Sequence, residues 1–264
     1  MRRWMLASLL ATALAGAARR RHALSPSGAT GAAAVGTAVF GAGGLRGSAL
    51  LLLFFGSSTA LSRLSGVASN GAEAGPRRTL AQVLANGGLP AALAVCDRLR
   101  PSPRVAAAYA GALAAANADT WATEIGTLSA TPPRLITTGR RVQRGVSGAV
   151  TPPGTLASLA GALVIGSCHA ALTRRPAAAL RLGAAGFAGA LADSVLGATL
   201  QAVYTCHVCT QCTEDRRHAH GARPPALTLV RGLPLMTNDT VNLCASLVGA
   251  IVGAWLDGRR PDAC

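Results

Sequence analysis

Long apolar stretches, separated by short polar or charged segments, dominate the sequence and predict helices. The first covers about residues 4–18, and the others lie at about 29–45, 48–62, 80–96, 104–118, 155–172, 182–203 and 241–256. Several are shorter than the roughly 20 residues that cross a bilayer upright. The pattern therefore predicts an all-α fold: a polytopic transmembrane helix bundle with about seven or eight spans.

The composition supports a membrane protein. Half of the 264 residues are hydrophobic, 13% are charged and only 3% are aromatic, and the mean hydropathy is +0.38. This balance is too apolar for an ordinary soluble domain. We expect residues 1–264 to form a single integral membrane domain, and the sequence leaves its oligomeric state open.

The charge of the chain points to anionic partners. The formal net charge is +15, and every basic side chain is arginine. Such an excess favours lipid headgroups, phosphates or nucleic acid. Nucleic acid is not expected, because the arginines are spread over short loops without a basic face or stacking aromatic residues.

A central stretch, residues 117–154, carries the candidate chemistry. Asp119 and Glu124 end the fifth apolar run, and a glycine-punctuated loop follows Pro132 and Pro133. Carboxylates bind Mg²⁺, and arginine forks bind phosphate oxygens. The candidate phosphate ligands in the loop are Arg134, Thr137, Thr138, Arg140, Arg141, Arg144, Gly145 and Gly148. The loop has no Walker A sequence, and a solvated basic loop near lipid headgroups is the alternative.

Polar residues in three other apolar runs extend this set. Asp193 is the only acid in the seventh run, and a carboxylate at membrane depth must face a cavity or a partner. Further candidate ligands open the fourth and last runs: Arg78, Asn86, Asn238, Asp239 and Asn242. Hydrogen bonding between helices and helix capping are the alternatives for these residues.

Eight spans would bring these pieces to one side of the membrane. Residues 77–88, 117–154 and 236–242 would share that side, while both termini would lie on the other. We therefore expect one site in which Asp119, Glu124 and Asp193 hold Mg²⁺, Asp239 takes part in catalysis, and the arginines and amides bind phosphate. The arginines divide almost evenly between the two sides, so the positive-inside rule does not decide the orientation.

The loop at residues 204–237 is rich in cysteine and histidine. It contains Cys206, Cys209 and Cys212, together with His207, His218 and His220. A zinc site is one interpretation; redox-active thiols and an incidental loop are the others.

Six motifs, in order, resemble a known family. They are RRTLAQVLANGG, ADTWATEIGTLS, PRLITTGRRVQRGVSGAV, TPPGTLAS, ADSVLGATLQ and NDTVN. They are similar to the integral membrane family that includes transmembrane protein nineteen and the phytyl-phosphate kinases of plants and cyanobacteria. The likeness covers nearly the whole chain, except for the variable loop at 204–237.

The resemblance implies a function that the residues alone do not. It implies a phosphotransferase with a phosphate group as acceptor, which converts a prenyl (phytyl) monophosphate to the diphosphate with Mg²⁺ and CTP or another nucleoside triphosphate. Such an enzyme supplies tocopherol and phylloquinone precursors. Its membrane would be the chloroplast envelope or thylakoid in a photosynthetic organism, and otherwise an endomembrane or the plasma membrane. The alternatives are a transporter or lipid flippase for an anionic substrate, and a CTP-dependent lipid cytidylyltransferase.

The N-terminal segment, residues 1–24, has two interpretations. Its arginines, alanines and lack of acids are typical of targeting segments. It is also apolar enough to be the first span. We expect it to be retained, because the family-like sequence begins directly after it.

Overall fold

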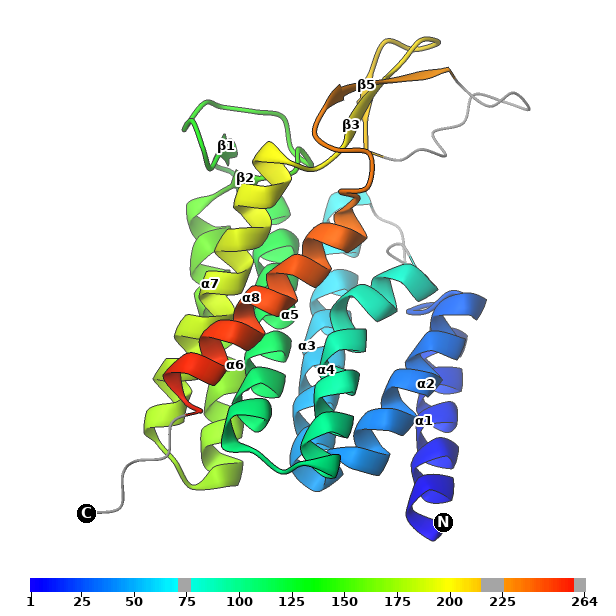
Figure 1. Ribbon diagram of the computed structural model, residues 1–264. Coiled ribbons are helices and arrows are strands. Elements are labelled where there is room, and N and C mark those ends of the chain that lie inside the picture. The colour runs from blue at the N-terminus through cyan, green and yellow to red at the C-terminus, as the bar shows by residue number, and fades with distance from the viewer. Residues whose placement is uncertain (71–76, 215–225, 259–264) are drawn as a thin grey trace.

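The computed structural model describes residues 1–70, 77–214 and 226–258. In these residues eight helices form one bundle (Figure 1). They are α1 (Arg2–Arg20), α2 (Pro26–Ala42), α3 (Gly44–Asn70), α4 (Leu80–Leu99), α5 (Pro103–Leu128), α6 (Pro152–Thr173), α7 (Ala177–Thr199) and α8 (Asn238–Leu256). The predicted helical bundle is confirmed, and each apolar stretch corresponds to one helix.

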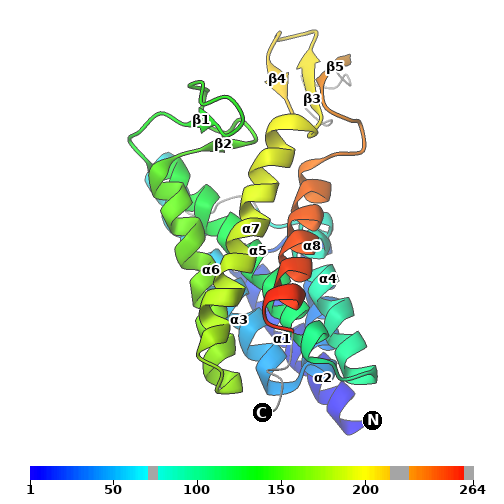
Figure 2. The ribbon, with the colours of Figure 1, turned by 60° about the vertical axis from the view of Figure 1, so that its left-hand side comes forward.

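Five of these helices are long and apolar enough to cross a membrane: α3, α4, α6, α7 and α8. Short strands lie at one end of the bundle. β1 (Arg134–Leu135) pairs with β2 (Ala149–Val150), and β3 (Val203–Cys206) lies between β4 (Cys212–Thr213) and β5 (Leu227–Arg231); all of these pairs are antiparallel. Figure 2 shows both strand groups beyond the same ends of α6, α7 and α8.

Local sequence explains where the helices begin. Ser25 accepts a hydrogen bond from the Gly28 amide at the start of α2, and Thr79 caps α4 in a capping box with Gln82, as such residues do at helix starts. Thr151 caps α6, and the two prolines that follow it fit the first helical turn.

The helix α5 is the centre of the bundle. Every residue from 107 to 118 is buried, and α5 packs against α3, α4, α6, α7 and α8. Small residues allow this close packing. A Cβ atom on Gly111 would lie 2.2 Å from the backbone oxygen of Gly249 in α8, and one on Gly186 in α7 would lie 2.6 Å from Cβ of Ala114.

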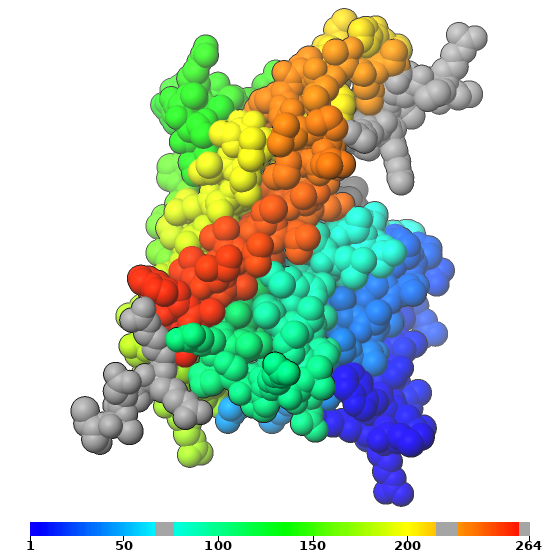
Figure 3. Space-filling model, viewed as in Figure 1, coloured from blue at the N-terminus to red at the C-terminus, as the bar shows by residue number. Residues whose placement is uncertain are grey.

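The helices α1, α2, α3 and α4 form the second side of the molecule. The space-filling view shows α4 beside α8, which crosses this face diagonally, with α2 and α1 beyond α4 (Figure 3). The helix α1 packs along α2, and α2 packs against α3 and α4. Backbone hydrogen bonds from Ser25 N to Arg78 O, 3.0 Å, and from Arg78 N to Ala23 O, 3.1 Å, tie the α1–α2 turn to the start of α4.

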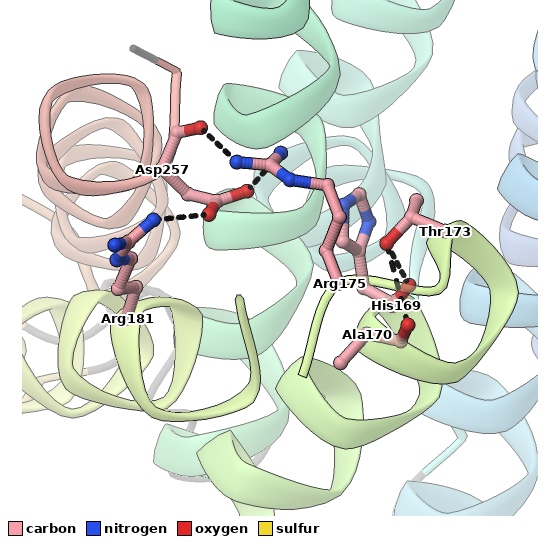
Figure 4. A network of polar contacts seen from close by, with 6 residues as sticks. All are labelled: His169, Ala170, Thr173, Arg175, Arg181 and Asp257. Carbon is pink, nitrogen blue, oxygen red and sulfur yellow. Dashed lines mark hydrogen bonds and ion pairs between the residues drawn. The ribbon is translucent and has the colours of Figure 1, made fainter. Parts of the chain in front are cut away.

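An ion-pair network closes the end of the bundle where α8 finishes (Figure 4). Asp257 is only 1% exposed. Its carboxylate accepts from Arg175 at 2.9 Å and from Arg181 at 3.4 Å. Because a buried carboxylate needs such partners, this network joins the α6–α7 turn to the end of α8.

Candidate functional site

A cavity of about 1200 Å³ extends through the bundle. It exceeds the roughly 300–1,000 Å³ typical of pockets for small ligands. One part is lined by polar residues of α5, α6, α7, α8 and the β1–β2 loop, and the other by apolar residues of α1, α2 and α3. The cavity can therefore accommodate an amphiphilic ligand.

Two carboxyl groups meet in the polar part. The carboxyl groups of Asp119 on α5 and Asp193 on α7 lie close enough to interact, and both line the cavity. Oδ1 of Asp193 is buried and has no hydrogen-bond donor among the described residues. Two adjacent carboxylates repel each other unless they share a proton or a cation, so this pair is suited to holding a positive ion.

Glu124 does not complete the expected three-acid Mg²⁺ site. Within the described residues, no three histidine, cysteine, aspartate or glutamate side chains come together as a metal-binding group. The helix α5 continues unbroken past Glu124, and five residues along a helix turn a side chain well away from the first. Glu124 instead accepts hydrogen bonds from two serines of α3, Ser62 at 2.5 Å and Ser65.

Arg78 lines the cavity near Glu124. Burial lowers the pKa of Arg78, and the Glu124 carboxylate acts in the opposite direction. The guanidinium carbon lies 5.8 Å from the centre of the Phe55 ring. A cation on an aromatic face is favourable. Arg78 thus sits between polar groups and the aromatic side chains of α3.

The β1–β2 loop contributes only part of its predicted ligands to the cavity. Arg144, Gly145 and Gly148 line it. Arg144 donates to the backbone oxygens of Thr127 and Ser129, which are left free at the end of α5. The remaining candidates in the loop do not line the cavity: Arg134, Thr137, Thr138, Arg140 and Arg141.

The amide side chains reach the cavity from two helix starts. Asn86 on α4 and both Asn238 and Asn242 on α8 line it. Asp239 does not: it lies in the first turn of α8, after the capping residue Thr237. The catalytic role expected for Asp239 stays a prediction.

Glu214 is a cavity residue that the sequence did not reveal. Its carboxylate accepts from Ser147 Oγ at 2.7 Å and from Gln201 Nε2 at 2.6 Å, and it lines the cavity. It directly follows β4, in the loop expected to be variable. In the sequence, Glu214 is only an acid in a basic loop. That pattern does not show that β3 and β4 place its side chain against the helical bundle.

The described part of the cysteine loop forms a small three-stranded sheet. Cys206 is buried in β3, whereas Cys212 in β4 is exposed, and the structure records both as free thiols. No metal-binding group forms among the described residues. His218 and His220 lie outside the described residues, so the zinc interpretation is not tested.

Comparisons with known proteins agree with this architecture. Residues 9–250 match the family described as "Integral membrane protein DUF92". The chain is 31% identical to Protein PGR of Arabidopsis thaliana, over 93% of both chains. It is 34% identical to the uncharacterized membrane protein MJ0933 of Methanocaldococcus jannaschii, over 68% of this chain and 62% of that one. No solved structure matches.

Neither relative's name states an activity, so these matches identify a family and not a reaction. They do confirm the resemblance inferred from the six motifs. Because the match covers nearly all of the helical bundle, the chain belongs to the integral membrane family DUF92.

Proposed function

We propose that this membrane protein is a kinase that phosphorylates a prenyl monophosphate to the diphosphate. The observation that carries the proposal is one continuous cavity, which joins a polar part with four acids and two arginines to an apolar part. A prenyl phosphate has the same division into an anionic head and a hydrocarbon tail. The motif resemblance supports the reaction class.

The donor set supports a magnesium ion. Asp119 and Asp193 would hold it, because Mg²⁺ in phosphoryl-transfer sites is bound by one or two carboxylates together with substrate phosphates. The unpartnered oxygen of Asp193 fits this role. When bound, the ion would neutralise charge on the donor phosphates.

The other polar residues would bind and orient the two substrates. Arg78 and Arg144 would grip phosphate oxygens, and Asn86, Asn238 and Asn242 would donate hydrogen bonds. A phosphate oxygen of the prenyl monophosphate attacks the terminal phosphorus of the nucleotide. A new P–O bond forms, the bond to the leaving diphosphate breaks, and the nucleoside diphosphate departs with that electron pair. The acceptor is already an anion, so this transfer needs no strong general base.

The test is a transfer assay with purified protein in detergent. Nucleoside triphosphates labelled in the terminal phosphate are offered with a panel of prenyl monophosphates, and products are separated by chromatography. We expect labelled prenyl diphosphate and unlabelled nucleoside diphosphate. Released pyrophosphate with a nucleotidyl-lipid product would instead identify a cytidylyltransferase. The absence of any product, together with prenyl phosphate movement across proteoliposomes, would favour the flippase.

The compartment follows from the source organism under this proposal. The motif resemblance implies the chloroplast envelope or thylakoid if the organism is photosynthetic, and one relative is a protein of the plant Arabidopsis thaliana. Fractionation of membranes from that organism, followed by immunodetection, would test the assignment.

A further inference from the structure

We propose that the apolar part of the cavity is a chamber for a long prenyl tail, and that the tail enters it from the bilayer between α1 and α3. We call this part the tail chamber; residues of α1, α2 and α3 line it, with Ala11, Leu14, Ala32, Phe40, Leu51 and Leu52 among them. The assumption that the ligand has a phosphate headgroup depends on the proposed function. The existence of the chamber is inferred only from the residues that line it.

The phenylalanines of the chain gather around this cavity. The chain has four of them, and all four, Phe40, Phe54, Phe55 and Phe187, line it. The tryptophans and tyrosines do not line it. The convergence of the phenylalanines indicates a surface that contacts an apolar ligand.

The tail chamber extends along all three helices. On α3 the apolar lining runs from Phe55 to Leu51, which is about 6 Å of helix. On α2 it runs from Ala32 to Phe40, which is about 12 Å of helix. Ala11, Leu14 and Ala15 of α1 complete the lining, so a tail in the chamber would contact three separate helices.

The junction between head and tail has a defined place. Arg78 lies over the Phe55 ring at 5.8 Å, with Glu124 near its guanidinium. Above this point the lining is polar, and along α3 below it the lining is leucine and phenylalanine. An anionic headgroup at Arg78 would therefore direct its tail toward Leu51.

The arrangement of α1 leaves a side of the chamber open to lipid. In the described part of the chain, α1 packs along α2 and forms no extended contact with α3, although both helices line the cavity. Leu14 on α1 and Leu52 on α3 line the cavity and are also 41% and 43% exposed. Exposed apolar side chains at both edges match the hydrocarbon of a bilayer, so a tail can enter sideways while its headgroup stays at the polar end.

A matched pair of variants tests the chamber by its volume. Ala32 lines the chamber, whereas Ala34, on the same helix, is exposed and does not. Ala32→Phe should lower the turnover of phytyl monophosphate relative to geranyl monophosphate by about tenfold or more. Ala34→Phe should leave this ratio unchanged. If Ala32→Phe keeps the wild-type ratio of phytyl to geranyl monophosphate turnover, the proposal is wrong.

A second measurement needs neither activity nor a folded variant. A prenyl monophosphate with a photoreactive diazirine at the tail end is irradiated with the wild-type protein in nanodiscs, and the labelled peptides are mapped by mass spectrometry. We expect labels on α1, α2 and α3 that unlabelled phytyl monophosphate suppresses. The same diazirine on a bulk phospholipid serves as the control for lipid-facing surfaces. Labels confined to α6 and α7, or labels that no competitor suppresses, would contradict the tail chamber.

The two tests separate this inference from the proposed function. Suppressible labelling of α1–α3 without phosphate transfer would keep the tail chamber and reject the kinase. Phosphate transfer with labels elsewhere would keep the kinase and reject the chamber.

Discussion

At the scale of single residues, the contact between Asp119 and Asp193 is the most informative feature of the site. The two carboxyl groups come from α5 and α7 and touch inside a bundle otherwise poor in charge. Unpaired charges there are costly. If the pair served only to pack the helices, two amides would cost less free energy to bury. The presence of two acids therefore indicates a bound cation or a shared proton.

The first prediction concerns this pair. We expect Asp119→Asn and Asp193→Asn each to slow phosphate transfer a few hundredfold, about 3–4 kcal/mol of transition-state stabilisation, and to weaken the dependence on Mg²⁺. The amide keeps the size of the side chain but loses the charge that attracts the ion. Initial rates across a Mg²⁺ titration measure the effect.

The control for these variants is Asp97→Asn near the end of α4. Asp97 accepts a hydrogen bond from the Ser102 amide, does not line the cavity, and should tolerate the change. Thermal unfolding should show little loss for the site variants, because a neutral amide is cheaper to bury. Near-native rates and Mg²⁺ dependence in both site variants would contradict the shared metal site.

A second prediction at this scale concerns Arg78. Arg78→Lys keeps the charge but loses the planar fork that grips phosphate and stacks on Phe55. We expect about tenfold weaker binding of a phosphorylated substrate, which corresponds to ~1.4 kcal/mol. Isothermal titration with phytyl monophosphate and with nucleotide would show which substrate is affected.

Two further variants serve as comparisons for the binding measured with Arg78→Lys. Arg98→Lys, in the last turn of α4 and exposed, should bind both ligands normally. Arg140→Lys tests the β1–β2 loop, whose Arg140 is exposed and outside the cavity. A loss equal to that of Arg78→Lys would mean that the loop closes over bound substrate. Normal binding by Arg78→Lys would remove Arg78 from the site.

At the scale of elements, the β1–β2 loop depends on how closely it approaches α7. Gly148 has a φ of +80°, and a Cβ atom there would lie 2.4 Å from the backbone nitrogen of Ala198. Only glycine suits both conditions. Gly139 in the same loop also has a positive φ, +68°, but a Cβ atom would meet nothing within 4 Å.

This contrast gives a third prediction. Gly139→Ala should cost about 1–2 kcal/mol from backbone strain alone. Gly148→Ala should lower the melting temperature further and reduce activity, because the loop must move away from α7 and takes Arg144 and Gly145 with it. Differential scanning fluorimetry in detergent and the transfer assay measure the two effects. Equal losses in the two variants would show that the contact with α7 is unimportant.

At the scale of the whole molecule, the polar part of the cavity lies at the end of the bundle that carries the strands. The start of α1 and the finish of α8 lie at the other end (Figure 1). The Asp257 network stabilises that opposite end. The proposed site and the ion-pair network therefore lie toward opposite ends of the bundle.

The fourth prediction follows from the placement of the termini and the strands at opposite ends of the bundle. In sealed vesicles, tags before Arg2 and after the end of the chain should be accessible from the same side. An added cysteine at Thr138, in the β1–β2 loop, should react with an impermeant maleimide only from the other side. The native thiols complicate labelling, so the experiment compares Thr138→Cys with the unmodified protein. Tags on opposite sides would contradict the bundle.

The sequence by itself determined the helices, their order and the family. Apolar runs and capping residues are local signals, so the start of α2 at Ser25 and the all-α membrane class could be predicted without tertiary contacts. The six motifs were enough to identify the DUF92 family. The placement of residues 77–88, 117–154 and 236–242 at one end followed from the alternation of spans.

Only the tertiary structure decided which of those residues meet. Helical spacing could show that Glu124 faces away from Asp119, but it could not show that Ser62 and Ser65 of α3 bind Glu124. It also could not place Glu214 beside Ser147, 67 residues earlier in the chain. Such contacts depend on how whole helices and strands pack around a shared space, and no local pattern encodes that space. For the same reason the sequence could not show which three helices would line the tail chamber.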